Sequence, residues 1–484
     1  MQEEKTSRKS TPLCQQDLPL KGNKCDLKRD SCGQCIRAGL TCSGYRNPNE
    51  LRIRDETNLV KVKVLVSKAG TISRFGDVSI EEKSRGVFYS HYVHGVARSY
   101  DVIELLRKAA PLDTHLDTSI TAVSLAFFHF RFFSLAASNL ASTTYLSALK
   151  LVNTALQNPK TLSSDSTLLA VLLLDLFEKI TNNNPVPSAL CLSHVNGALA
   201  LVKLRDSIQF QTYIGRRLSF RLTSCLVISC VAANATVPRA LKNLRTELEY
   251  SLNVADPKWN LTDWIIKTTD FRGAIRNGSL SDPDIVLQAT LLDNGLASLS
   301  ADMPVAWLSQ RKYLQRPSKR VFGQFYDLYP DYNVTQTHNV IRLTRIMLND
   351  TIRSTCRKAS FEYNTTDVEP ISLSFIDSII DDLAREICSS GPQLIGSEDS
   401  PTPQETVSSA RTFFCYTLLF PFYVAALYAS SNSMIKDWVI CQMRFMSAEL
   451  DIRNAGTVAE MLEKGDRTDP WSVYAMLGSY AFAA

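Results

Sequence analysis

Four cysteines near the start of the sequence have the spacing of metal ligands. Gaps of six, two and six residues separate Cys25, Cys32, Cys35 and Cys42. Thiolates are soft ligands suited to zinc, and four of them complete its tetrahedral coordination. The short Cys32–Cys35 gap lets both sulfurs face one ion, and Gly33 eases the tight turn. We therefore predict a zinc site at these cysteines. A cytosolic redox pair, or cysteines in a disordered tail, are the alternatives.

Positive charge is concentrated in the same part of the chain. Residues 1–63 contain 13 Lys or Arg and 8 Asp or Glu, whereas the remaining 421 residues contain 40 of each kind. The whole net charge of +5 therefore belongs to the cysteine-bearing end. Because such a charge attracts polyanions, we expect an anionic partner there.

The sequence around these cysteines resembles the second half of the fungal binuclear zinc cluster, over residues 24–26 and 31–45. In that family six cysteines hold two zinc ions and present a basic helix to the DNA major groove. The resemblance implies zinc as a structural cofactor, one or two ions, and double-stranded DNA with GC-rich half-sites as the partner. The basic side chains that we expect to contact DNA are Lys21, Lys24, Lys28, Arg29 and Arg37.

The segment departs from the family pattern at its first cysteine pair. That pair would stand at Gln15 and Leu18, and Cys14 is a doubtful stand-in one residue away. The departure removes one bridging and one terminal ligand, so the remaining four cysteines could hold a single zinc. Only Lys21 and Lys24 are basic where the family contacts bases, and a solvated face is their alternative role. Two explanations of this departure stay open. One is a misassigned exon junction before residue 24, and the other is decay of the cluster.

From about residue 81 the apolar residues recur with helical spacing. Asn158-Pro159 should end one helix, and Ser164 or Asp165 should cap the next, whose apolar run 168–177 should be central. A third face carries Leu192, Val195, Leu199 and Val202. Further helices are expected near residues 212–233, 284–300, 333–356, 371–389, 405–429 and 434–453, with a low-complexity loop at 390–405.

Two features of the sequence indicate where in the cell the protein is found. No apolar stretch follows the first residues, so we expect no secretory signal, and the seven cysteines from Cys191 to Cys441 should be small buried hydrophobes. Residues 412–435 carry no charge and could span a bilayer by length. Pro421 should break this stretch midway, which favours a buried helix pair and no membrane association.

The helical part resembles the fungal-specific regulatory domain that follows many zinc clusters. The resemblance rests on Phe88-Tyr89, Tyr145, the run 172–178, His194 with Gly197, and Val237-Pro238, in that order. It implies an all-α domain tied to regulation and effector sensing.

Several polar residues of this domain are candidates for ion pairs or ligand contacts. Glu178 should pair with Arg205 or Arg216, and His194 should bond Glu178 or a backbone carbonyl. His91 and His94 should belong to a packed aromatic helix. For Arg216, Arg217 and Arg221 a solvated face is favoured over phosphate contacts.

The sequence thus predicts an all-α protein in four parts. Residues 1–23 form an atypical, disordered segment, 24–45 a partial zinc module, 46–80 a linker and 81–484 the regulatory domain. No hydrolase, phosphate-loop, zinc-protease or dinucleotide motif occurs, so no enzyme is expected. We expect a nuclear, zinc-dependent, sequence-specific DNA-binding transcription factor that regulates RNA polymerase II transcription in a fungus. Its other partners would be the transcriptional machinery, co-regulators and, as an open alternative, a second copy in a homodimer. The rival is a helical interaction or effector-binding protein that has lost DNA binding.

Overall fold

The computed structural model describes residues 33–37, 39, 78–94, 100–181, 197, 199–205, 212–233, 235–250, 256–362, 373–396, 409–430, 434–466 and 468–477. The chain divides into two units, residues 1–78 and residues 79–484, and each is described on its own. In the first unit the described residues form a short helix, α1 (Gly33–Arg37).

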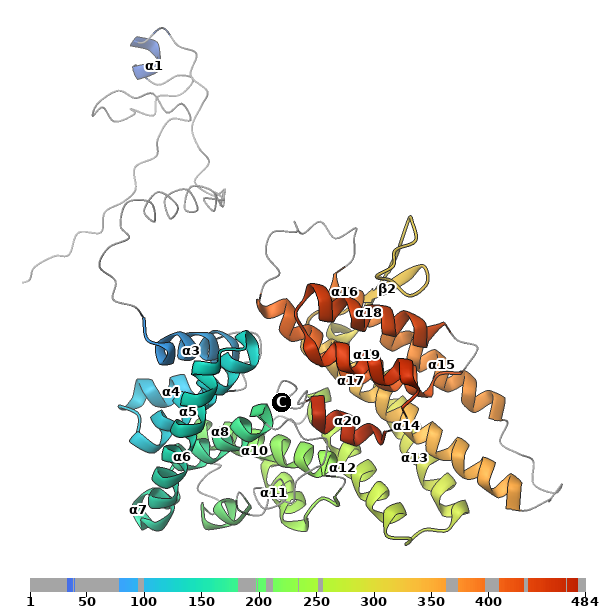
Figure 1. The fold of residues 1–484 in the computed structure, drawn as a ribbon, viewed down its shortest axis with the longest axis horizontal. Helices are drawn as coiled ribbons and strands as arrows, with labels where there is room; N and C mark the ends of the chain where they lie inside the picture. The colour runs from blue at the N-terminus through green and yellow to red at the C-terminus, as the bar shows by residue number, and fades with distance from the viewer. Residues whose placement is uncertain are drawn as a thin grey trace, which may run out of the picture. The chain divides into compact units, whose positions relative to one another are not determined.

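The described part of the second unit is almost entirely helical (Figure 1), which confirms the predicted all-α class. Its first group of helices packs around α5 (Thr114–Phe132), which contacts α3, α6 and α8. The other elements of this group are α3 (Ile80–Phe88), a π-helical turn (Tyr89–Val93), α4 (Val102–Ala109), α6 (Leu135–Gln157), α7 (Pro159–Leu162) and α8 (Asp165–Thr181).

Helix α8 shows how local sequence sets this arrangement. The Ser164 hydroxyl accepts a hydrogen bond from the backbone N–H of Thr167 at 3.1 Å, which caps the helix as predicted. Leu168, Leu172 and Leu173 are each at most 2% exposed, because the apolar run is covered on several sides by neighbouring helices. The predicted central position of α8 is confirmed.

The middle group comprises α10 (Tyr213–Ala232), α11 (Arg239–Glu249), α12 (Pro257–Arg276) and α13 (Asp282–Ala301). Asp256 caps α12 through its Oδ1, which accepts from the Lys258 N–H at 2.9 Å. Helices α12 and α13 approach closely at Gly295, where a Cβ atom would lie 2.0 Å from Trp264 Cη2. Glycine is therefore required at this contact. Helices α11 and α12 were not predicted from the sequence.

The C-terminal group surrounds α17 (Ser409–Tyr428), which contacts α14, α15, α18, α19 and α20. These neighbours are α14 (Tyr332–Glu362), α15 (Leu373–Ser390), α16 (Pro392–Ile395), α18 (Ile435–Glu449), α19 (Arg453–Lys464) and α20 (Pro470–Leu477).

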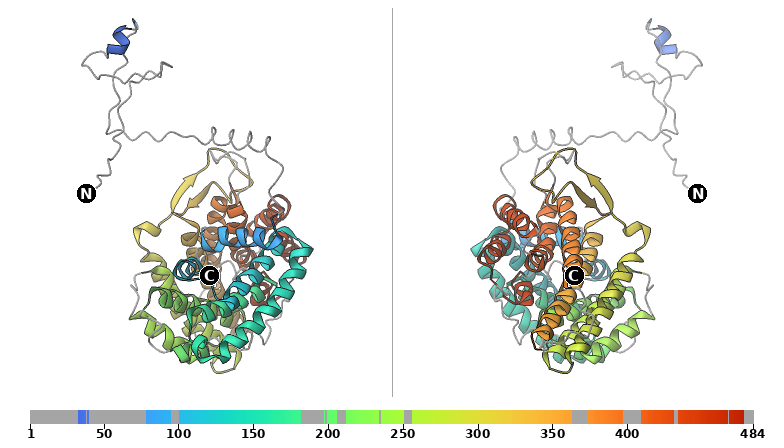
Figure 2. Two further views of the ribbon diagram at one scale, coloured as in Figure 1. Left: turned by 90° about the vertical axis from the view of Figure 1, so that its left-hand side faces the viewer. Right: turned by 90° about the vertical axis from the view of Figure 1, so that its right-hand side faces the viewer.

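A two-stranded hairpin interrupts the helices between α13 and α14. After a single 3₁₀ turn (Val305–Trp307), strand β1 (Gln310–Tyr313) pairs antiparallel with β2 (Phe325–Leu328), with Arg311 opposite Asp327. Figure 2 shows the hairpin at the margin of the helices. The sequence analysis predicted no strand there, because four-residue strands carry almost no periodic signal.

Two sequence predictions for this region are wrong. Pro421 does not break its helix, since α17 continues through it. The loss of one backbone hydrogen bond is offset by burial, because Phe420 and Phe422 on either side are 3% and 0% exposed. The predicted loop at 390–405 is helical at its start, where Leu394 and Ile395 of α16 are buried, and residues 397–408 lie outside the described residues.

The prediction for the scattered cysteines is confirmed in part. The buried cysteines are Cys225, Cys230, Cys388 and Cys415. Cys356 is only half-buried, and Cys441 is exposed on α18, so the prediction is wrong for Cys441. Cys191 lies outside the described residues.

Removal of the α8 cap tests the role of Ser164. We expect Ser164→Ala to lower the free energy of unfolding by about 1 kcal/mol, because the Thr167 N–H loses its acceptor. Urea-induced unfolding followed by circular dichroism measures the change. Ser142→Ala is the matched control, since the exposed Ser142 hydroxyl only donates to the Ser138 carbonyl within α6. Equal losses for both variants would contradict the capping role.

Candidate functional site

The residues predicted to bind zinc and DNA lie almost wholly outside the described residues. These are Cys14, Cys25, Cys32, Cys42, Lys21, Lys24, Lys28 and Arg29. Cys35 is described only as a backbone position in α1. Arg37 is exposed at the end of α1, and its Nε donates to the Gly33 carbonyl at 3.0 Å. The zinc site and the DNA contacts stay predictions.

The described parts of the chain hold no cluster of three or more His, Cys, Asp or Glu side chains that could bind a metal ion. His91 lies in the π-helical turn, with its ring 5.0 Å from that of Phe127 and 4.9 Å from that of Tyr92. Burial, with a smaller effect from Arg131, lowers the pKa of His91 to about 3. The predicted packed aromatic environment of this histidine is confirmed.

The predicted ion pair between Glu178 and Arg205 is not formed. Arg205 instead binds the Asp165 carboxylate and donates to the Ser164 carbonyl at 2.7 Å, so it ties the helical residues 199–205 to the start of α8. The Glu178 carboxylate accepts from the hydroxyl of Tyr145, whose ring stacks on Phe177 at 4.2 Å. The predicted partner of Arg205 is wrong because Asp165 and Glu178 lie on the same helix, and the alternative pairing of Glu178 with Arg216 stays a prediction. His194 lies outside the described residues.

The predicted solvated arginine face on α10 is wrong for Arg221, and for Arg216 it stays a prediction. Arg217 donates to both carboxylate oxygens of Asp101 at 2.8 Å. Arg221 is only 7% exposed, and its guanidinium lies 4.6 Å from the centre of the Tyr100 ring. Arg221 therefore acts within the protein, whereas Arg217 is held by Asp101 with its side chain still 37% exposed.

A cavity of about 160 Å³ lies between α10, α12, α14, α17 and α20. Apolar side chains from three of these helices line most of it, among them Val227, Val231, Leu261, Ile265, Val340 and Leu343. Three aromatic rings form a further part of the wall, with Phe420 4.8 Å from Tyr474 and 5.8 Å from Trp471. The cavity is therefore apolar with a rigid aromatic side.

Two cations also line this cavity. Burial lowers the pKa of Lys258, and nearby Arg221 lowers it further, against a smaller opposite effect from Asp256. Burial also lowers the pKa of Arg272 to about 10, although Asp469 partly compensates. The Arg272 guanidinium lies 3.8 Å from the centre of the Trp471 ring, which links α12 to α20. Both cations are costly to keep charged in this setting.

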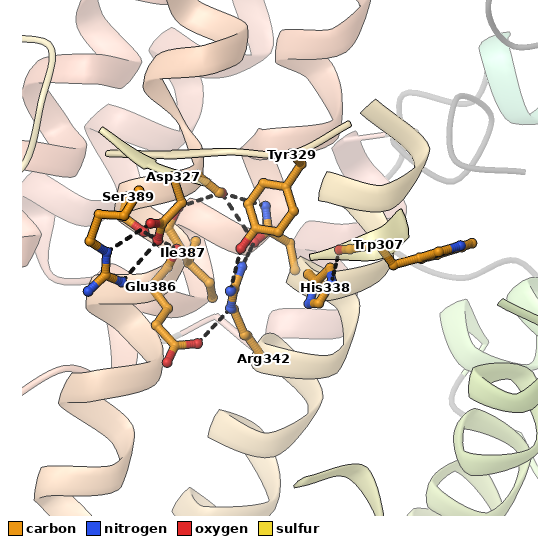
Figure 3. A network of polar contacts seen from close by, with 11 residues as sticks. Trp307, Asp327, Tyr329, His338, Arg342, Glu386, Ile387 and Ser389 are labelled. Atoms are coloured by element: carbon orange, nitrogen blue, oxygen red, sulfur yellow. Dashed lines mark hydrogen bonds and ion pairs between the residues drawn. The ribbon is translucent and has the colours of Figure 1, made fainter. Parts of the chain in front are cut away.

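A second polar centre fixes the hairpin to α14 and α15 (Figure 3). Asp327 accepts from Arg311 Nε at 3.0 Å and from the Ser389 hydroxyl at 2.7 Å. Arg342 donates to the Tyr329 hydroxyl at 2.6 Å and to Glu386 at 2.8 Å. The hydrogen bonds of this network join the hairpin, α14 and α15 to one another, so its role is structural.

The charges of this network follow from its contacts. Burial alone would raise the pKa of Asp327, but hydrogen bonds from Arg311 and Ser389 outweigh burial and leave that pKa lowered. His338 Nε2 lies 3.1 Å from the Trp307 carbonyl, and burial next to Arg342 lowers the pKa of His338 to about 4. His338 is therefore neutral at physiological pH.

Part of the helical unit is similar to a known domain family. Residues 88–269 match the fungal specific transcription factor domain. This match runs from the end of α3 into α12, so it covers the cavity walls from α10 and most of those from α12. It confirms the resemblance of the helical part and indicates a fungal transcriptional regulator, from a domain family that is generally non-enzymatic.

The other comparisons add no relatives. The chain matches no zinc cluster family, and neither a curated protein nor a solved structure matches it. Within the described parts of the chain, no helix has the length and apolar character needed to cross a membrane.

Sequence reasoning missed every residue of the cavity. One signal was present, because Asp256-Pro257 is a typical helix start and Lys258 places a cation at the unfavourable end of the helix dipole. Two of the residues that join Lys258 at the cavity, Gln336 and Trp471, are more than 75 positions away in sequence. Only the tertiary structure brings them together.

The lowered pKa of His338 predicts a pH dependence of stability. Since the folded pKa is about 4 and the ordinary value about 6.5, the unfolded chain binds the proton first on acidification. This histidine therefore lowers the free energy of unfolding as pH falls from about 6.5 towards 4, by up to ~1.4 kcal/mol per pH unit. Urea titrations of wild type and His338→Phe across this range should show a shallower slope for the variant.

The same titrations between pH 7 and 8 serve as the control, because this histidine is neutral in both states there. Parallel slopes for the two proteins below pH 6.5 would contradict the assignment.

Proposed function

We propose that this protein is a zinc-dependent, sequence-specific DNA-binding transcription factor that regulates RNA polymerase II transcription in a fungus. One observation carries the proposal: the match of residues 88–269 to the fungal specific transcription factor domain, in a chain that also has four cysteines with zinc-ligand spacing. The domain match supports a transcriptional role, and the cysteine spacing supports the means of reaching DNA.

The roles divide between the two units. Cys25, Cys32, Cys35 and Cys42 would hold structural zinc and so give a short polar segment a fixed fold. The basic side chains of the same segment would contact DNA phosphates and bases, among them Arg37, which is exposed on α1. The helical unit would regulate this activity and contact co-regulators in the nucleus.

The charge distribution supports DNA as the partner. The net charge of +5 lies within residues 1–63, next to an electroneutral remainder. Each basic contact with a phosphate releases condensed counterions, so affinity should fall as salt rises, with a log–log slope of about −0.9 per contact. Only Lys21 and Lys24 occupy the stretch where the family reads bases, so backbone attraction should exceed base discrimination.

The missing first cysteine pair favours a second candidate function. Gln15 and Leu18 stand where two zinc ligands would be expected, which is consistent with a helical interaction or effector-binding protein that has lost DNA binding. Zinc content and DNA affinity of the full chain separate the two candidates.

Substitution of a proposed zinc ligand tests the leading proposal. We expect the full chain to contain one or two zinc ions by mass spectrometry of the metal, and Cys35→Ser to lower that content. We also expect its affinity for a GC-rich duplex, measured by fluorescence anisotropy at several salt concentrations, to fall by about tenfold or more, because the basic segment loses its fixed fold.

Cys441→Ser is the matched control, because Cys441 is an exposed cysteine on α18, outside the zinc segment. This variant should keep both zinc and DNA affinity. A wild-type chain without zinc and without salt-dependent DNA binding would overturn the proposal in favour of the second candidate.

A further inference from the structure

The cavity between α10, α12, α14, α17 and α20 has few polar groups available to a ligand. Five of its lining residues are threonines, and each hydroxyl donates its hydrogen to a carbonyl four residues earlier in the same helix, at 2.7–2.9 Å. These donors are therefore occupied.

Three other polar side chains reach the cavity from three different helices. They are Ser224 of α10, Lys258 of α12 and Gln336 of α14. Within the described parts of the chain, no hydrogen bond or ion pair engages the hydroxyl, the ammonium or the side-chain amide of these residues. A hydroxyl, an amide and an ammonium that line one apolar cavity from three helices are the polar groups of a ligand site.

The charge on Lys258 is unfavourable in the empty cavity. Lys258 is the second residue of α12, where the helix dipole is positive, and Arg221 lies close enough to lower its pKa. Among the described residues, the acid that opposes this effect is Asp256, whose carboxylate already accepts the Lys258 backbone N–H. An anion bound at Lys258 would remove this electrostatic cost.

The size and lining of the cavity limit the rest of the ligand. A cavity of about 150 Å³ in another protein holds benzene, so about 160 Å³ suits a body of roughly six to ten non-hydrogen atoms. The lining is aliphatic on α10, α12 and α14 and aromatic at Phe420, Trp471 and Tyr474. An apolar body with one anionic end fits both features.

We propose that this cavity is a binding site for a small organic monocarboxylate, with its carboxylate at Lys258, Ser224 and Gln336 and its apolar body between α10, α14 and the aromatic wall. The ammonium donates to the carboxylate, and the hydroxyl and amide donate to the remaining lone pairs. Arg272, held over Trp471, adds a second positive charge at the cavity. The role of this ligand as the effector of a transcription factor rests on the proposed function, whereas the site itself rests on the helical unit alone.

Binding of matched acids and amides to the full chain tests the site. Isothermal titration calorimetry with phenylacetate and hexanoate should show binding in the submillimolar range. Phenylacetamide and hexanamide, which have the same shape without the charge, should bind at least about tenfold more weakly. Lys258→Met should weaken phenylacetate by a similar factor and should not lower the melting temperature of the unliganded protein, because it removes an uncompensated charge.

Lys267→Met is the matched control, because Lys267 is an exposed lysine on the same helix that contacts the Trp264 ring. This variant should bind phenylacetate as wild type does, and Lys258→Arg should keep the preference for acid over amide. Equal affinity for acid and amide, unchanged binding in Lys258→Met, or no binding to wild type up to about 10 mM would overturn the site.

A DNA titration with and without phenylacetate separates this inference from the proposed function. A chain that binds phenylacetate but no DNA keeps the site and overturns the transcription-factor mechanism. A chain that binds DNA but none of the acids keeps the transcription-factor mechanism and overturns the site.

Discussion

The burial of α17 is the constraint on which the C-terminal part of the helical unit depends. From Leu418 to Ala425 its described side chains are apolar or aromatic and at most 3% exposed, apart from the proline at 421. It contacts α14, α15, α18, α19 and α20. Each of these helices buries apolar side chains against α17. This burial also explains why Pro421 is tolerated inside the helix, since neighbouring helices hold the backbone that the proline would otherwise release. The same helix supplies Phe420 to the cavity wall.

Several buried or half-buried arginines of the helical unit lie against aromatic rings. Arg221 lies over Tyr100, Arg245 over Trp259 at 3.6 Å and Arg272 over Trp471 at 3.8 Å. A ring face stabilises a desolvated cation without requiring a buried carboxylate, and it fixes the direction of the guanidinium. Arg245 also donates to Asp263, whereas at the cavity the positive charges outnumber the acids that oppose them. Overall neutrality of residues 64–484 therefore coexists with a locally positive cavity.

The sequence predicted features that depend on short-range chemistry. Three of these features depend only on residues that are close together in sequence. They are the cap at Ser164, the end of α6 before Pro159 and the buried run of α8. Side-chain partners were predicted poorly, as Arg205 and Asp165 illustrate, because the choice between two acids on α8 depends on how a distant helix docks. The four-residue strands and the cavity were missed for the same reason, since neither has a local signature.

The cavity crosses the edge of the family match, and this has a consequence for how the helical unit is divided. Residues 88–269 contribute the walls on α10 and most of those on α12, whereas α14, α17 and α20 lie beyond the match and supply the opposite side. A fragment cut at the limits of the match would expose Val227, Val231 and Leu261 to water. The free-energy cost of this exposure is about 25 cal/mol for each Å² of apolar surface. The segment that matches the domain family is thus smaller than the segment that folds, and the folding unit extends at least to α20.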